Sequence, residues 1–587
     1  MNKLLIFTVF SLFIIGCNKP KENKQLKTLF EHYYEERLQF FPLEATSQGD
    51  NRFNDKLPID ISEGYRKSLL SFYQTYLNSL DRIETKELSE DELIQYNTLR
   101  FNLNTEIEGL TYPSHLTPFN QFTGLPLTFA QLGSGEASQP FKTTQDYDNW
   151  LKRIDQFVIW ADTAIANFDK GIASQFVLPK SLVVKMIPQM HDLSEPAATE
   201  NLFFEPIKKL PTNFTPEQKI SYTQKYTEAI DKKIRPAYKK LEVYLAKTYL
   251  KAARPSSGIG ALKIGKKYYD YQTYYWTTSL KTPDEIFQTG LSEVSRIQKE
   301  MLKVKDQVGF KGDLLTFFES VKSDPKLMPY KTPEEVLAAF KAIQTKIDPN
   351  LKKIFNNTPK TGFEIRRTEA FREASASAEY MQGTADGSRP GIFYVPILDA
   401  TKFNITSGME SLFLHEAIPG HHYQVSLQQE NQTIPKFMRF GWYGAYGEGW
   451  ALYTESLGKE LGLYTDPYQY FGSLGDEMHR AIRLVVDVGI HIKGWSREEA
   501  LNYMLQNEAI SKEGAIAEIE RYMAIPGQAL SYKIGALKIR ELRAKYTTSL
   551  GEKFNLADFH DQVLKNGCLP LSVLEETLDA WANKLAK

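Results

Sequence analysis

The chain has 587 residues, of which 71 are lysine or arginine and 72 are aspartate or glutamate. This balance lacks the excess of basic residues that nucleic-acid binding requires, so we expect no nucleic-acid partner. The length exceeds what a single hydrophobic core usually supports, and we therefore expect two lobes.

The first residues predict an export signal. A basic lead at residues 1–3 precedes an apolar run at residues 4–15, and the following Gly-Cys pair resembles the cleavage site of bacterial lipoprotein signals. The run is too short to span a bilayer core of about 30 Å. We interpret residues 1–16 as a lipoprotein signal peptide, Cys17 as the lipidated first residue of the mature protein and residues 17–24 as a tether. The alternative is an ordinary secretory signal with a chance cysteine.

The expected location is therefore the cell envelope. Asn18 is not the aspartate that retains such proteins at the inner membrane of enteric bacteria, which favours a lipid anchor in the outer membrane, on its periplasmic or surface side. Besides Cys17 the sequence holds a single cysteine, Cys568. We therefore expect no intramolecular disulfide and no thiolate metal site.

Residues 25–280 predict an N-terminal helical lobe. Apolar side chains recur at spacings of three and four, as in Leu26, Leu29, Phe30 and Tyr33, which is typical of one buried helix face. Several prolines and glycines interrupt this pattern at residues 112–141, where we expect a long loop.

Residues 281–587 predict a C-terminal lobe that contains the metal site and a small sheet. Thr282 is a candidate N-cap with proline in the first helical turn. Short β-branched and aromatic runs at residues 362–367 and 391–396 are bounded by glycine and proline and predict strands. The predicted fold class is mainly α, with two helical lobes and a small β-sheet beside an active-site cleft.

A histidine-rich stretch at residues 414–424 carries the main chemical signal. His415 and Glu416 begin a pattern that resembles the zinc-protease signature His-Glu-x-x-His, but Pro419 stands where the second histidine is expected. Histidines six or seven apart on a regular helix cannot reach one ion, whereas proline cannot continue a regular helix. A loop-out of two residues would place His421 as second ligand, and a loop-out of three would place His422. We favour His421, because the Gly-His order resembles the His-Glu-x-Gly-His form of helical zinc peptidases; a helix end with incidental histidines is the alternative.

A later helix offers the third ligand. Glu448 is flanked by glycines near the start of a predicted helix, and thermolysin-like zinc sites take a glutamate from such a helix. We therefore predict Zn²⁺ bound by His415, His421 and Glu448, with Glu416 as general base. Glu455 lies seven residues after Glu448, and we expect it to orient a ligand imidazole. The alternative is an acid placed near a helix N-terminus, where the helix dipole favours it.

These stretches, together with residues 386–394, 483–491 and 526–532, resemble the bacterial family called domain of unknown function 885. That family is grouped with helical zinc peptidases related to angiotensin-converting enzyme and the carboxypeptidase Taq group. The resemblance implies a two-lobed zinc-peptidase-like fold whose cleft admits short or unfolded peptides. It also implies an edge strand beside the metal that pairs with the substrate. We expect residues 391–395 to have that role, with Tyr394 in substrate binding; a strand that only covers the core is the alternative.

Downstream residues are candidates for stabilising the transition state of peptide hydrolysis. Relatives commonly supply a tyrosine and a histidine for the oxyanion, and we choose Tyr532 first and His491 second. Arg483, Asp487 and His491 are spaced by four, so they share one helix face. Arg483 could hold a substrate carboxylate in a bidentate clamp, and the alternative for this face is a buried set of salt bridges.

Together these features predict a lipid-anchored zinc metallopeptidase, a hydrolase that cleaves short or unfolded peptides in the cell envelope. Its expected partners are a peptide substrate and, through the lipid anchor, a membrane. The alternative is a non-catalytic helical lipoprotein that binds peptides or nutrients.

Overall fold

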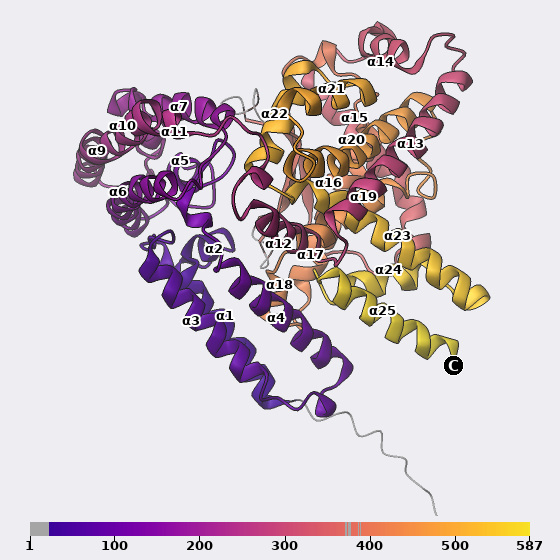
Figure 1. Ribbon diagram of the computed structural model, residues 1–587, viewed down its shortest axis with the longest axis horizontal. Helices are drawn as coiled ribbons and strands as arrows, with labels where there is room; N and C mark the ends of the chain where they lie inside the picture. Colours follow the sequence, from indigo (N-terminus) through magenta and orange to yellow (C-terminus); the bar gives the residue numbers. More distant parts are fainter. Residues whose placement is uncertain (1–22, 370–372, 374–376, 385–386, 388) are drawn as a thin grey trace, which may run out of the picture.

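The computed structural model describes residues 23–369, 373, 377–384, 387 and 389–587. The predicted signal peptide and Cys17 lie outside these described residues. The predicted fold class is confirmed, because the chain is mainly α-helical and contains a small three-stranded sheet (Figure 1). Within the described ranges, no helix is both long and apolar enough to cross a membrane.

From residue 23 to residue 280 the described chain is built mainly of helices joined by loops. Its helices are α1 (Lys24–Phe40), α2 (Pro42–Ser47), α3 (Glu63–Leu80), α4 (Glu90–Gly109), α5 (Leu125–Gly133), α6 (Thr144–Ala173), α7 (Lys180–Ser194), α8 (Glu205–Lys208), α9 (Pro216–Ala229), α10 (Arg235–Tyr244), α11 (Leu250–Ala252) and α12 (Gly265–Thr277). Helices α1, α3 and α4 share one apolar core, whereas α5 to α10 share another (Figure 1).

The predicted loop at residues 112–141 is only partly a loop, because it contains α5. Pro126 lies in the first turn of this helix, where its missing N–H has no intrahelical partner to lose. Phe129 of α5 then stacks between Trp150 and Phe157 of α6, with ring centroids 4.5 and 4.3 Å away. This aromatic packing holds a proline-flanked segment in helical form.

The C-terminal half contains the longer helices and the sheet. Its helices are α13 (Pro283–Gln307), α14 (Leu314–Ser323), α15 (Pro333–Ile354), α16 (Met409–Glu416), α17 (His421–Glu430), α18 (Lys436–Arg439), α19 (Gly444–Glu455), α20 (Pro467–His491), α21 (Arg497–Asn507), α22 (Lys512–Ala524), α23 (Ser531–Leu550), α24 (Leu556–Leu564) and α25 (Leu571–Ala586). Thr282 caps α13 as expected, in a capping box with Glu285.

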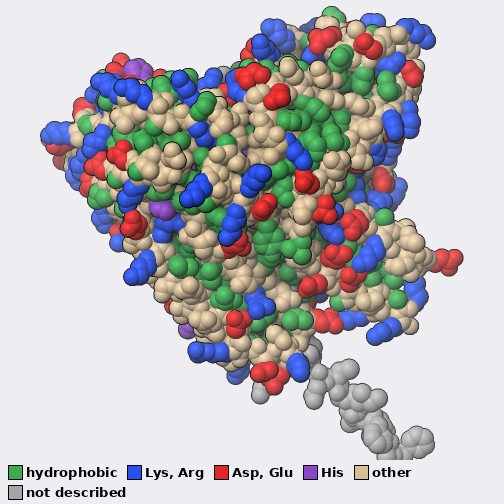
Figure 2. All heavy atoms as spheres, in the orientation of Figure 1, with side chains coloured by type: hydrophobic (Ala, Val, Ile, Leu, Met, Phe, Trp, Pro, Cys, Tyr) green, Lys and Arg blue, Asp and Glu red, His purple; other side chains and the backbone are tan. Residues whose placement is uncertain are grey.

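A large apolar core joins many of these helices. It includes α12, whose buried tyrosines pack with α19 and α23 although α12 precedes residue 281. The lobe boundary at residue 280 stays a prediction. On the face seen in Figure 2, basic and acidic side chains are interspersed, in keeping with the balanced charge of the sequence.

The sheet has the strand order β1 (Phe363–Arg367), β3 (Gly391–Val395), β2 (Glu379–Met381). Strand β3 is parallel to β1 and antiparallel to β2, so Tyr394 lies opposite Arg366 on one side and Glu379 on the other. The prediction that residues 391–395 form an edge strand is therefore wrong. A strand with neighbours on both sides has no free ladder for a peptide, and all five residues of β3 are buried.

Candidate metal centre

Two histidines and a glutamate from three helices meet at one point. Nε2 of His415 lies 3.7 Å from Oε2 of Glu448, and Nε2 of His421 lies 3.4 Å from the same oxygen. One ligand atom from each residue falls within 4.8 Å of the other two. His415 comes from α16, His421 from α17 and Glu448 from α19.

The interruption predicted between the two histidines is present. Helix α16 ends at Glu416 and α17 begins at His421, with Pro419 and Gly420 between them. A side chain at Gly420 would place Cβ 1.9 Å from the carbonyl oxygen of His415, which is backbone and cannot give way. The chain therefore folds back here only because glycine follows proline.

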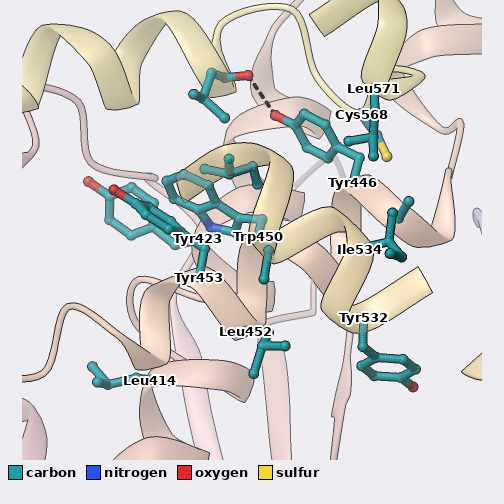
Figure 3. Packing of buried hydrophobic residues seen from close by; sticks show 14 of the residues in the cluster. Leu414, Tyr423, Tyr446, Trp450, Leu452, Tyr453, Tyr532, Ile534, Cys568 and Leu571 are labelled. Atoms are coloured by element: carbon teal, nitrogen blue, oxygen red, sulfur yellow. Dashed lines mark hydrogen bonds between the residues drawn. The ribbon is translucent and has the colours of Figure 1, made fainter. Parts of the chain in front are cut away.

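Hydrogen bonds from helix α19 stabilise the turn between α16 and α17. The indole N–H of Trp450 donates to the carbonyl oxygen of Pro419 at 2.9 Å, and the hydroxyl of Thr454 donates to that of Leu414 at 2.9 Å. Figure 3 shows Trp450 and Tyr453 packed beside Tyr423 of α17. These contacts fix the helix that carries Glu448 against the segment that carries the histidines.

Two glycines beside Glu448 permit close packing on both sides. Helices α19 and α23 cross at Gly449 and Gly535, where an added Cβ on Gly535 would lie 1.7 Å from the carbonyl oxygen of Ala445. On the other side, Gly447 lies against the ring of Trp442, which also packs against His421 with ring centroids 5.8 Å apart. The glycines thus set the position of the glutamate between them.

The geometry fits a zinc ion. Zinc binds imidazole and carboxylate at about 2.0–2.2 Å, so atoms around a tetrahedral ion lie about 3.3–3.6 Å apart, close to the 3.4 and 3.7 Å separations here. Two imidazoles and one carboxylate also form a donor set of catalytic zinc sites. The other His/acid group, around His191, is different: it is largely exposed, and Lys239 already forms ion pairs with its Glu195 and Glu242 at 2.6 and 3.0 Å.

Glu455 contacts the ring nitrogen of His415 that does not face Glu448. Nδ1 of His415 lies 2.7 Å from Oε1 of Glu455, which places the N–H on Nδ1 and turns Nε2 toward Glu448. Burial lowers the pKa of His415, but hydrogen bonds to Glu448 and Glu455 outweigh it and raise the pKa to about 10. Burial conversely raises the pKa of Glu448, yet its bonds to both histidines bring it well below the usual range.

Glu416 lies at the end of α16 with its carboxylate uncommitted. Among the described residues it accepts no hydrogen bond and forms no ion pair, and it is 8% exposed. Burial raises its pKa, while the charges of His415, His421 and Arg480 lower it. A free carboxylate beside three convergent ligands has the placement of a proton acceptor.

Helix α20 adds two residues that the sequence reasoning missed. Oδ2 of Asp476 accepts a hydrogen bond from the Ser411 hydroxyl of α16 at 2.5 Å, and Nη1 of Arg480 lies 3.8 Å from Oδ1 of Asp476. Arg480 acts electrostatically on Glu416 and Glu455. The available signal was the acid–arginine pair at a spacing of four, on the same helix as Arg483, Asp487 and His491.

The face of α20 that carries Arg483, Asp487 and His491 packs into the protein core. Asp487 accepts hydrogen bonds from the Tyr269 hydroxyl at 2.6 Å and from the Gly527 N–H at 3.1 Å. Nδ1 of His491 accepts from the N–H of Ile259 at 3.0 Å, and its Nε2 donates to the carbonyl oxygen of Tyr522 at 3.0 Å. His491 as an oxyanion donor is therefore a wrong prediction, because backbone groups occupy both ring nitrogens.

Arg483 does not form the expected bidentate clamp. Its Nη2 donates to Glu518 at 2.9 Å and its Nε to the Tyr522 hydroxyl at 3.2 Å, which leaves Nη1 alone unpaired among its nitrogens. The guanidinium lies 4.5 Å from the ring centroid of Tyr532. The buried salt-bridge alternative describes this arginine better.

Tyr532 keeps its candidacy as a donor. Its hydroxyl has no hydrogen-bond partner within the described part of the chain, and its ring lies 5.9 Å from the guanidinium of Arg480. Figure 3 shows the ring pointing away from Ile534 and Cys568. It therefore lies on the side of α23 where the Arg480 and Arg483 guanidinium groups are found.

His422, the alternative second ligand, faces the sheet. Its Nδ1 lies 3.1 Å from the Tyr380 hydroxyl of β2 and 3.3 Å from the Ser426 hydroxyl, and its ring packs on Phe363. Burial lowers its pKa to about 4. His422 is absent from the convergent group, so the structure favours the loop-out of two residues over the loop-out of three.

By its fold and site, this chain is a mainly helical protein with a candidate metal centre of two histidines and one glutamate. The family model of a bacterial protein of unknown function, DUF885, matches residues 42–578. The chain therefore belongs to this family.

Two solved structures are similar over nearly the whole chain. The "putative lipoprotein" from Colwellia psychrerythraea is 29% identical with a TM-score of 0.89, covering 95% of this chain and 99% of its own. A second "putative lipoprotein of unknown function", from Shewanella oneidensis, is 20% identical with a TM-score of 0.73, covering 94% and 99%. The second likeness shows the fold alone. No curated protein matches the chain.

Proposed function

We propose that this protein is a lipid-anchored zinc metallopeptidase that hydrolyses short or unfolded peptides in the bacterial cell envelope. The observation that carries the proposal is the convergence of His415 Nε2, His421 Nε2 and Glu448 Oε2 on one point. Glu416 beside this point and Glu455 behind His415 complete the arrangement of a hydrolytic site.

The protein residues have separate tasks in this proposal. A zinc ion, when bound, lowers the pKa of water and polarises a carbonyl group. Glu416 takes a proton from the attacking water and returns it to the leaving amine. The hydroxyl of Tyr532 and the guanidinium of Arg480 donate to the oxygen on which negative charge develops. Glu455 holds the imidazole of His415 in the required tautomer.

Attachment to the envelope belongs to the same proposal. Support comes from the lipoprotein-like signal that ends at Cys17 and from the Colwellia psychrerythraea protein, which is itself described as a putative lipoprotein. The lipid on Cys17 would tether the helical body to the outer membrane, and the peptide-cleaving site would face the compartment outside the inner membrane.

The test is turnover of a mixed peptide library by a purified soluble form that starts at Asn18, with products identified by mass spectrometry. We expect cleavage with zinc present, and a loss of about 100-fold or more in Glu416→Gln while zinc stays bound. Glu460→Gln, at a surface ion pair with Arg543, is the matched control and should keep full activity. Activity that survives Glu416→Gln would contradict the assigned base. Peptide binding without any turnover would favour the non-catalytic binding protein.

A further inference from the structure

A cavity beside the metal centre is lined by Trp442, whose ring also contacts His421. The cavity has a volume of about 410 Å³ and is lined by residues of α1, α4, α12 and the segment that joins α17 to α19. Trp442 lines this cavity, and the same ring packs against His421 and against Gly447, the neighbour of Glu448. A molecule bound in the cavity is thus separated from the candidate zinc-binding residues by the ring of Trp442.

The walls of the cavity are rich in aromatic rings. These rings include Tyr33, Phe101, Tyr275, Trp276, Trp442 and Tyr443. Aromatic faces attract cations because the ring quadrupole places negative charge on each face. A cavity of this composition suits a compact positive group.

Four charged residues line the wall: Arg37 and Glu44 pair with each other, Arg439 keeps its positive charge while it bonds to a backbone carbonyl, and Glu106 is the fourth. Arg37 forms an ion pair with Glu44. Arg439 donates to the carbonyl oxygen of Gln429 at 2.6 Å. The charge of the Arg37–Glu44 pair is internally balanced, so neither residue leaves a free charge for a ligand.

The fourth, Glu106 on α4, has no such partner. Its carboxylate has no hydrogen bond and no ion pair anywhere in the described part of the chain. Burial raises its pKa, and the opposing charges of Arg37 and Glu44 are the other influences on it. The carboxylate acts most strongly of all groups on the pKa of Tyr275, which places it among the aromatic rings. A bound cation would supply the ion-pair partner that this half-buried carboxylate lacks.

We propose that this cavity binds a primary ammonium group of the peptide substrate, held by the carboxylate of Glu106 and enclosed by the rings of Tyr275 and Trp442. The inference rests on the proposed peptidase function, because it names the feature by which that site would select its peptides. An ammonium supplies the donors that Glu106 lacks and gains from the aromatic walls. The group can come from the amino terminus of a peptide or from a lysine side chain.

The experiment measures binding, which does not depend on catalysis. Calorimetry with the zinc-loaded Glu416→Gln protein would compare three probes: tetra-alanine, its N-acetyl form, and N-acetyl-Ala-Lys-Ala-Ala. We expect a probe with an ammonium to bind at least about tenfold more tightly than N-acetyl tetra-alanine. Adding Glu106→Gln should remove that advantage, whereas adding Glu108→Gln, on the exposed side of the same helix, should keep it.

Comparison of the three probes identifies the source of the ammonium. An advantage for tetra-alanine alone supports recognition of the peptide amino terminus, and one for the lysine probe alone supports recognition of the side chain. Equal binding of all three probes, no binding of any of them, or an equal loss for every probe in Glu106→Gln would overturn the inference. If the protein prefers probes with an ammonium but cleaves no peptide, the peptidase proposal is contradicted and the cation site is supported. Cleavage of peptides without a preference for the ammonium would support the peptidase proposal and contradict the cation site.

Discussion

Oε1 of Glu455, the last residue of α19, lies 2.7 Å from Nδ1 of His415. The two residues are 40 positions apart, and Glu455 is seven residues beyond Glu448 on the same helix face. One helix therefore supplies both a candidate ligand and the carboxylate that orients another ligand. This pairing makes the centre depend on the exact docking of α19.

Glu455→Gln tests that dependence. An amide at this position is a weaker acceptor and carries no charge, so we expect zinc affinity to fall about 10- to 100-fold. Competition with a fluorescent chelator measures the affinity. Glu460→Gln serves as a control, since its carboxylate pairs with Arg543 at the surface. An unchanged affinity in Glu455→Gln would mean that this carboxylate does not support the ligand.

Single replacements of the two adjacent histidines should separate their roles. Nε2 of His421 lies 3.4 Å from Oε2 of Glu448, whereas His422 contacts Tyr380 and Phe363 of the sheet. We expect His421→Ala to lose bound zinc and His422→Ala to retain it, as measured by metal analysis after dialysis. Loss of zinc in His422→Ala alone would show that three residues loop out and that His422 is the second ligand.

Gly420→Ala should damage the turn between α16 and α17. The added Cβ would lie 1.9 Å from the carbonyl oxygen of His415 and 2.3 Å from that of Leu414. We expect a loss of about 1–3 kcal/mol in the free energy of unfolding, together with weaker zinc binding. Gly475→Ala is the matched control, because an added Cβ there meets open space on a helix. Equal stability of both variants would contradict this description of the turn.

The sequence predicts part of this centre and fails at other parts for physical reasons. His415 follows from the resemblance to the zinc-protease signature, Glu448 from its glycine-flanked place on a later helix, and Glu455 from its spacing of seven from Glu448. Pro419 signals where the helix must break. Periodicity cannot reveal that the ring of His491 bonds to Ile259, which is 232 positions away. Such a partner exists only after the chain has folded.

The sheet shows the same limitation. Two of its strands were predicted, but β2 has only three residues and gives no periodic signal. Because β2 pairs with β3, the strand expected at the edge is in the middle. Arg480 was missed for a related reason: spacing places it beside Arg483 on α20, and only the packing of α16 decides which arginine lies near Glu416.

Asp487 should make stability depend on pH. Burial raises its pKa to about 7 against 3.8 for a free group, although bonds from Tyr269 and Gly527 and the charge of Arg483 act in the other direction. The folded state therefore holds a proton between about pH 4 and 7 that the unfolded state has released, so ionisation of Asp487 costs stability as pH rises through this window.

Asp487→Asn removes that titration and keeps an acceptor oxygen for Tyr269 and Gly527. Relative to the wild type, its free energy of unfolding should rise by about 1 kcal/mol per pH unit between pH 5 and 7 and level off above. Urea denaturation at a series of pH values measures the difference. A difference that stays constant with pH would contradict the raised pKa.

The most direct test of the central claim is a crystal of the zinc-loaded protein measured at the zinc absorption edge. We predict one anomalous peak within about 2.0–2.2 Å of Nε2 of His415, Nε2 of His421 and a carboxylate oxygen of Glu448. A peak only at the surface group of His191, Glu195 and Glu242, or no peak at all, would contradict the account.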